Sequence, residues 1–247
     1  MRTHLAIVLL LAVLTTDAWP VLASGKPESL IPLDKLDAGA RARVGQVVPG
    51  YTFYRQVRIP RETFTARFDL FEYLINHLDQ SSIIAERLKI VQYRSQRTPD
   101  GGYWADNRKG AAGYLWPLYA APGDRLYFAQ GSDHEGKPVA GCAVVVVHYR
   151  EKTPGVITCE MHAFVKVESW IQRLLAHIFL PLVTGTVDRR FGEVLEVPVL
   201  VSEQATADPA RVIGVIDSLA SEDRAVLQEF RKLLVGAPAN VGKRPAP

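Results

Sequence analysis

Histidine and glutamate side chains that alternate along one predicted strand are the first candidates for chemistry in this sequence. Glu160 and His162 stand two residues apart in the run VITCEMHAFVKV, and His148 lies in the preceding run GCAVVVVHYR. A histidine beside a carboxylate can transfer protons or hold a metal ion. No third ligand is evident in the sequence, and the same residues also suit the polar face of an ordinary strand. Both interpretations stay open at this point.

A second group of polar residues would suit an enzyme with an apolar pocket. Burial in such a pocket shifts the pKa of a carboxylate or a tyrosine, and Asp106, Arg108, Arg125 and Tyr149 are candidates. Asp106 and Arg125 come from separate predicted strands and would equally form a cross-strand ion pair. The motifs GxSxG, HExxH, the glycine-rich phosphate loop and paired CxxC do not occur in the sequence. We therefore name no catalytic residue, and the sequence implies no cofactor and no metal site.

Aromatic residues gather in one part of the chain that has the texture of β-strands. Seven of them lie between positions 103 and 128, namely Tyr103, Trp104, Tyr114, Trp116, Tyr119, Tyr127 and Phe128. A cluster of this kind either lines a ligand pocket or fills a hydrophobic core.

The strands that would carry these groups are predicted from the alternation of apolar and polar residues. In the run at 156–167 the odd positions are apolar and the even ones mostly polar, which is typical of a half-buried strand. The segment EKTPG at 151–155 predicts a hairpin with the preceding run. With the turn centred near Thr153, the numbers of paired residues sum to about 306. The inner face then holds Val145, Val147, Tyr149 and Met161, whereas His148, Glu160 and His162 fall on an outer, wetter face.

The same register predicts whether the two cysteines can form a disulfide. It places Cys142 opposite Phe164 and Cys159 opposite Val147, so that the two sulfur atoms lie on opposite faces of the sheet. Their Cα atoms would be farther apart than the roughly 4.4–6.8 Å that a disulfide needs. We therefore expect two free, buried thiols.

The N-terminal residues have the pattern of a secretory signal peptide. Arg2 precedes the apolar run LAIVLLLAVL, and VLA at 21–23 offers a cleavage site after Ala23. The apolar run is shorter than the roughly 20 residues that span a bilayer. We expect an exported protein, with the bacterial periplasm as its destination. The net charge of +3 and the scattered basic residues give no reason to expect a nucleic-acid partner.

Element order follows from periodicity along the rest of the chain. We expect a short helix near 36–47, a first strand at 52–60, and two short helices at 68–78 and 83–88. About six strands follow between 89 and 167, and a long helix opens near Ser169 and continues to about Leu195. Two further helices are expected at 209–219 and 221–235.

In element order the chain resembles the START-like, or SRPBCC, helix-grip superfamily of lipid-transfer proteins, Bet v 1-like plant allergens and polyketide cyclases. The resemblance rests on FDLFEYLINHL directly after the first strand, on the strands GYWADN, GAAGYLWPLY and RLYFAQG, and on ITCEMHAFVKV leading into WIQRLLAHIFLPLV. It implies an α+β fold in which a curved antiparallel sheet of about seven strands wraps around a long C-terminal helix. The expected parts are a signal peptide at 1–23, an N-terminal extension at 24–49, a ligand-binding domain at 50–200, a helical extension at 201–236 and a disordered tail at 237–247.

The resemblance also implies a cavity between the sheet and the long helix. Its ligand would be a lipid, a sterol, a terpenoid or a similar hydrophobic molecule, held for transport or sequestration, with transient membrane contact as a further expectation. Pro181 would bend the helix, and Gly185 would leave room over the pocket. Alternatives are a cyclase-like or isomerase-like enzyme on the same fold and an envelope module that docks a protein through its C-terminal helices. The expected pocket residues are Trp104, Tyr114, Trp116, Tyr119, Phe128, Val145, Val147, Tyr149, Met161, Ile178, Leu182 and Gly185.

Overall fold

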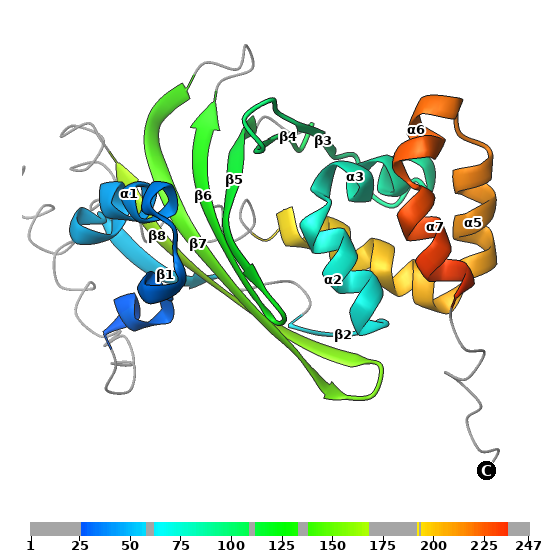
Figure 1. The fold of residues 1–247 in the computed structure, drawn as a ribbon, viewed down its shortest axis with the longest axis horizontal. Coiled ribbons are helices and arrows are strands. Elements are labelled where there is room, and N and C mark those ends of the chain that lie inside the picture. The colour runs from blue at the N-terminus through cyan, green and yellow to red at the C-terminus, as the bar shows by residue number, and fades with distance from the viewer. Residues whose placement is uncertain are drawn as a thin grey trace, which may run out of the picture. The chain divides into compact units, whose positions relative to one another are not determined.

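A curved antiparallel sheet forms the centre of the protein, and helices lie against both of its faces (Figure 1). The computed structural model describes residues 26–57, 62–108, 112–132, 138–167, 192 and 194–236. Residues 26–30, which include a short 3₁₀ helix at Pro27–Leu30, form a unit separate from the body that begins at Ile31.

The sheet has eight strands in the order β1-β8-β7-β6-β5-β4-β3, with β2 also paired to β8. The pairings between the described strands are all antiparallel, and irregular register between Pro117 and Tyr119, and at two further places, adds curvature. The strands are β1 Phe53–Val57, β2 Thr63–Thr65, β3 Arg94–Arg97, β4 Tyr103–Asp106, β5 Ala112–Ala121, β6 Asp124–Ser132, β7 Pro138–Thr153 and β8 Val156–Val167.

The hairpin of β7 and β8 corrects the predicted register. Its turn is made by Pro154 and Gly155, and Gly155 takes a φ of 78°, which suits the third position of a type II turn. Paired residues therefore sum to 308, as in Val147 with Met161, and not to 306. The shift is two residues, so every side chain keeps its predicted face. The cysteines are free and buried, as expected.

Helices fill the concave side of the sheet and a smaller set covers the convex side. Residues 194–207 are helical, so this helix runs through the boundary placed at 200/201. The other helices are α1 Ala38–Val47, α2 Phe68–Asn76, α3 Leu78–Arg87, α5 Pro209–Asp217, α6 Ser221–Val226 and α7 Gln228–Val235, with 3₁₀ turns at Leu33–Lys35 and Val48–Gly50.

The concave face carries a core of small and β-branched side chains beneath α2 and the helix at 194–207. On β7 and β8 it holds the predicted inward residues, among them Val145, Val147 and Met161. Phe71 and Ile75 of α2 and Leu195 pack onto them and are each at most 2% exposed. The amphipathic pattern of FDLFEYLINHL therefore places α2 as the sequence predicts.

The convex face is drier than the alternation suggests, because α1 covers part of it. Ala40, Val44 and Val47 recur along one stripe of α1 and are buried against β7 and β8. Asp37 caps this helix, since its Oδ1 accepts a hydrogen bond of 2.7 Å from the Ala40 N–H. Part of the outer face is therefore buried, and His162 on that face is just 7% exposed.

The C-terminal helices complete a second core with α2 and α3. Val212, Ile216, Phe230 and Leu234 are buried there, together with Leu70 of α2. Their apolar faces are thus occupied within this chain. Among the described residues we find no helix that is long and apolar enough to cross a membrane.

The end of α3 has an unusual residue in a left-handed conformation. Lys89 has a φ of 58°, and the N–H of Ile90 bonds back to the Ala85 carbonyl at 3.0 Å, which is the pattern of a Schellman cap. Glycine is preferred at this position because a side chain there costs about 1 kcal/mol. Arg108, just after β4, has a similar φ of 56°, and its N–H donates to Asp106 Oδ1 at 2.7 Å.

Candidate functional site

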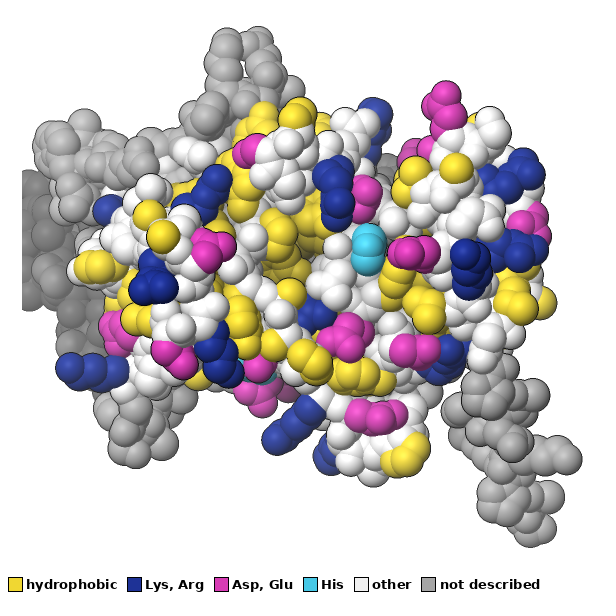
Figure 2. All heavy atoms as spheres, viewed as in Figure 1, with side chains coloured by type: hydrophobic (Ala, Val, Ile, Leu, Met, Phe, Trp, Pro, Cys, Tyr) yellow, Lys and Arg dark blue, Asp and Glu magenta, His cyan; other side chains and the backbone are white. Residues whose placement is uncertain are grey.

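A cavity of about 330 Å³ lies between the concave face of the sheet and the helices. In Figure 2 a hollow floored with hydrophobic side chains is visible between the strands β5 and β6 and the helices α2 and α3. The sheet contributes Tyr127, Ala129, Ala143, Val145, Val147 and Met161, and the helices contribute Leu78, Val194 and Leu195.

Small residues on the concave face of the sheet leave this space. Leu115, Ala129 and Ala143 are neighbours across β5, β6 and β7, and Gly113 pairs with Gly131 in the next row. Alanine and glycine at these inward positions remove the side chains that would otherwise meet the helices. A Cβ at Gly113 would lie 2.7 Å from the Gln130 carbonyl oxygen, so close backbone approach also requires glycine there.

Four of the expected pocket residues line the cavity, namely Tyr114, Val145, Val147 and Met161. Tyr149 lies on the same face, one alternation beyond Val147, and packs in the concave core. Ile178, Leu182 and Gly185, with the predicted bend at Pro181, lie outside the described residues.

The remaining expected aromatics are not among the residues that line the cavity. Trp116, Tyr119 and Phe128 pack in the core of the convex face, where the Arg43 guanidinium of α1 stacks over the Trp116 ring at 4.5 Å. Trp104 is not part of the lining, although its cross-strand partner Tyr114 and its chain neighbour Ala105 are. The physical reason is that both faces of the sheet are covered, so aromatic residues can be buried at even positions as well as odd ones.

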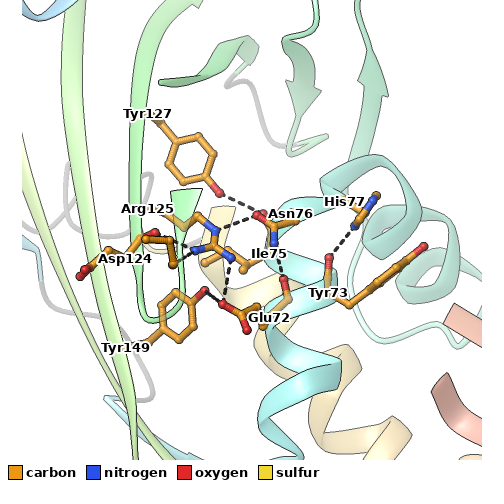
Figure 3. Close-up of polar contacts among 10 residues, drawn as sticks. Glu72, Tyr73, Ile75, Asn76, His77, Asp124, Arg125, Tyr127 and Tyr149 are labelled. Atoms are coloured by element: carbon orange, nitrogen blue, oxygen red, sulfur yellow. Dashed lines mark hydrogen bonds and ion pairs between the residues drawn. The ribbon is translucent and has the colours of Figure 1, made fainter. Parts of the chain in front are cut away.

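A buried polar network lies next to the cavity at Arg125 (Figure 3). The guanidinium is 3% exposed, and it donates to Asn76 Oδ1 at 2.7 Å, to Glu72 Oε1 at 3.2 Å and to the Asp124 carbonyl at 2.7 Å. The Ala121 carbonyl accepts a further bond from Nη1. The Tyr149 hydroxyl also donates to Glu72 Oε1, at 3.1 Å. Arg125 therefore pairs with Glu72 of α2, and the expected partner Asp106 instead accepts from the Arg108 backbone.

The network holds the C-terminal end of α2 against the sheet. A helix end leaves backbone carbonyls without intrahelical partners. Here the Tyr127 hydroxyl donates to the Ile75 carbonyl at 2.9 Å and the Tyr103 hydroxyl to the Asn76 carbonyl at 2.7 Å. The tyrosines of the concave face thus satisfy the end of the helix and fix its distance from the floor of the cavity.

Burial keeps these hydroxyls protonated. It raises the pKa of Tyr127 and of Tyr149 well above the ordinary value, and the nearby Arg125 charge offsets only part of that rise. Sequence reasoning named Arg125 and Tyr149 but missed Glu72, Asn76 and Tyr127 as their neighbours. The available signal was the acidic Glu72 on the otherwise apolar side of FDLFEYLINHL.

The histidines of the convex face form a smaller polar group. The His162 Nδ1 lies 2.8 Å from the Tyr54 hydroxyl, and the His148 Nδ1 lies 2.7 Å from Asp124 Oδ1. Glu160 pairs with His148 across β7 and β8. Burial is the main cause that lowers the pKa of His162, and the neighbouring His148 adds to it. Among the described residues no cluster of three or more potential ligands is arranged to hold a metal ion.

No family model and no curated protein matches this chain. Solved structures that this chain resembles in part include a conserved protein from Geobacillus kaustophilus, with a TM-score of 0.42 and 9% identity over 58% of this chain and 93% of that one. The protein XoxI from Bacillus cereus has a TM-score of 0.36 and 13% identity, and the alignment covers 64% and 96% of the two chains. A protein from Arthrobacter aurescens has a TM-score of 0.34 and 12% identity, with 58% and 83% covered.

Proposed function

We propose that the protein is an exported carrier that binds a hydrophobic small molecule in the cavity between the sheet and its helices. The apolar cavity of about 330 Å³ is the observation that carries this proposal. Pockets of about 300–1,000 Å³ hold small molecules in proteins, and burial of apolar surface drives such binding. The cavity lies at the lower end of that range, which favours one acyl chain or a small ring system over a whole phospholipid.

The helix-grip architecture is part of the same proposal. An antiparallel sheet whose concave face is lined by small residues, with a helix at 194–207 against it, is consistent with that fold. Export depends on the N-terminal signal pattern, and Edman sequencing of the secreted protein should begin at Ser24. A chain recovered with Met1 at its start would contradict export by this route.

The polar groups beside the cavity support a carrier over an enzyme. The hydroxyls of Tyr127 and Tyr149 and the Arg125 guanidinium are engaged with α2 and with backbone carbonyls. Their role in the fold is therefore to position the helix, and the surface offered to a ligand is mainly apolar.

Filling the cavity tests the proposal. Ala143→Leu places additional methyl groups where space exists, so ligand uptake should fall at least tenfold while the free energy of unfolding changes by less than about 1 kcal/mol. The matched control is Ala163→Leu, at a fully buried core position outside the cavity lining, which should cost about 1–3 kcal/mol by overpacking.

Organic extraction and native mass spectrometry of the native and Ala143→Leu proteins give the readout. The native protein should carry or take up an apolar ligand that the variant lacks. Equal uptake by both proteins, or no uptake of any apolar compound by the native protein, would overturn the proposal.

A further inference from the structure

A polar hollow lies beside the apolar cavity, and three of the eight residues that line it are basic. Lys89, Arg94 and Arg108 line it, and Tyr93 belongs to the lining of both the hollow and the cavity. Figure 2 shows lysine or arginine side chains at the edge of the hydrophobic hollow, over β3 and β4. Because the apolar cavity and the basic hollow have Tyr93 in common, together they suit a ligand that has an apolar part and a charged head.

The charge in this hollow favours an anion. Glu86 is the one acidic residue in its lining, against three basic residues. No ion pair between described residues involves Lys89, Arg94 or Arg108. Asp106 lies opposite Arg94 across β3 and β4, and its carboxylate accepts the Arg108 N–H. The Arg94 guanidinium can also donate to the Gln96 side-chain oxygen, but this neutral group does not offset its charge, so all three positive charges can attract a carboxylate or phosphate.

Two of these three basic residues, Lys89 and Arg108, have a left-handed backbone conformation. Within the described part of the chain, Lys89 and Arg108 are the two non-glycine residues with a positive φ. Left-handed backbone at a long charged side chain is unfavourable, and such positions tend to occur where a site needs the side chain. Both occur in this hollow, at the end of α3 and just after β4.

We propose that the ligand is an amphiphile with a single apolar chain or ring and an anionic head, whose head binds Lys89, Arg94 and Arg108 while its apolar part occupies the cavity. This inference rests on the proposed carrier function, and it adds the chemical class of the ligand. A carboxylate and a phosphate monoester share the required charge, and both geometries suit an arginine.

The test compares probes that share one tail. Isothermal titration calorimetry of the full chain with decanoate, decyl phosphate and decanol should give anion affinities roughly tenfold above that of decanol, as expected for a few exposed charge pairs. Raising sodium chloride from 0.05 to 0.5 M should reduce this advantage and leave decanol unaffected. If decanoate binds more tightly, the natural head group is a carboxylate. If decyl phosphate binds more tightly, it is a phosphate monoester.

Glycine substitutions separate the role of the side chain from that of the backbone. Lys89→Gly and Arg108→Gly relieve the left-handed strain, so each should raise the midpoint of thermal unfolding by about 2–4 °C. Each should also weaken decanoate binding by roughly three- to fivefold without changing the affinity for decanol. Lys89→Arg should retain binding, and Lys152→Gln, at the hairpin end of β7, should leave it unchanged.

The results separate failure of the carrier proposal from failure of the anionic-head inference. If none of the three probes binds, the carrier proposal fails. If decanol and decanoate bind equally and the glycine variants change neither, the anionic head is rejected while the cavity stands. If the variants lose binding to phosphatidylglycerol vesicles but keep full decanoate affinity, the cations serve a membrane surface and the inference is overturned.

Discussion

The guanidinium of Arg125 on β6 lies 3.2 Å from Glu72 Oε1 on α2, and this contact joins the sheet to the helix beside the cavity. The arginine is almost fully buried, whereas the glutamate side chain is 27% exposed. The two partners therefore have unequal roles. When the arginine is removed, several acceptors lose their hydrogen-bond donor. When the glutamate is neutralised, the remaining side-chain oxygen still accepts a hydrogen bond.

Arg125→Met should consequently destabilise the protein by about 3 kcal/mol, because the Ala121 and Asp124 carbonyls and Glu72 lose their donor together. Glu72→Gln should cost less, about 1–2 kcal/mol, because the buried guanidinium loses its counter-charge but keeps a hydrogen-bond acceptor. Urea denaturation at pH 7 measures both values, and Arg150→Met, at an exposed strand position, is the control. Equal losses for Arg125→Met and Arg150→Met would contradict a structural role for the network.

Helix α1 should be required for the stability of the sheet. Val44 is 3% exposed and faces the strands, so Val44→Asp buries an uncompensated charge and should cost at least about 3 kcal/mol. Gln46→Asp, at an exposed position of the same helix, should change the free energy of unfolding by less than about 1 kcal/mol. Denaturation followed by tryptophan fluorescence measures both variants, and similar losses in the two would show that α1 does not contribute to the core.

Stability should fall on the acid side because of His162. Burial lowers the pKa of this histidine in the folded protein below its ordinary value of 6.5, so the unfolded chain binds more protons. The stabilisation is present above pH 6.5 and is lost as the pH falls through the folded value. His162→Gln should therefore show a shallower loss of unfolding free energy between pH 7 and pH 5. A slope identical to that of the native protein would assign the acid sensitivity to other groups.

Stability should also fall on the alkaline side because of Cys159. Burial raises the pKa of this thiol from 9.0 to about 12, so the folded state keeps a proton that the unfolded chain releases. The stabilisation is complete below pH 9 and is lost as the pH approaches 12. Between pH 9 and pH 10 the Cys159→Ala variant should lose less stability than the native protein, when both are measured with reductant present. Rapid reaction of the folded native protein with a thiol reagent at pH 8 would contradict the buried, protonated state.

Local pattern was sufficient to predict the hairpin faces but not its register. The turn was placed near Thr153, whereas Pro154 and Gly155 form it. Since side chains along a strand repeat every two residues, the resulting two-residue error left Val147 and Met161 on the correct face. An error of one residue would have inverted the whole inner face.

Contacts between distant segments were beyond prediction from the sequence. Alternation shows that Trp116 and Phe128 share a face, but it does not show that α1 covers that face. Glu72 and Arg125 are separated by 53 positions, and their pairing depends on how α2 crosses the sheet. Spacing within a segment carries no information about such a crossing, which is why the expected partner was Asp106.

The position of the two cysteines has a practical consequence. They are the whole cysteine content of the chain, and one packs in the convex core while the other packs in the concave core. With the sheet between them, no oxidant can join them without unfolding the protein. The fold is therefore indifferent to the redox potential of its surroundings, so material produced in a reducing cytoplasm should have the same structure as material recovered from an oxidising one.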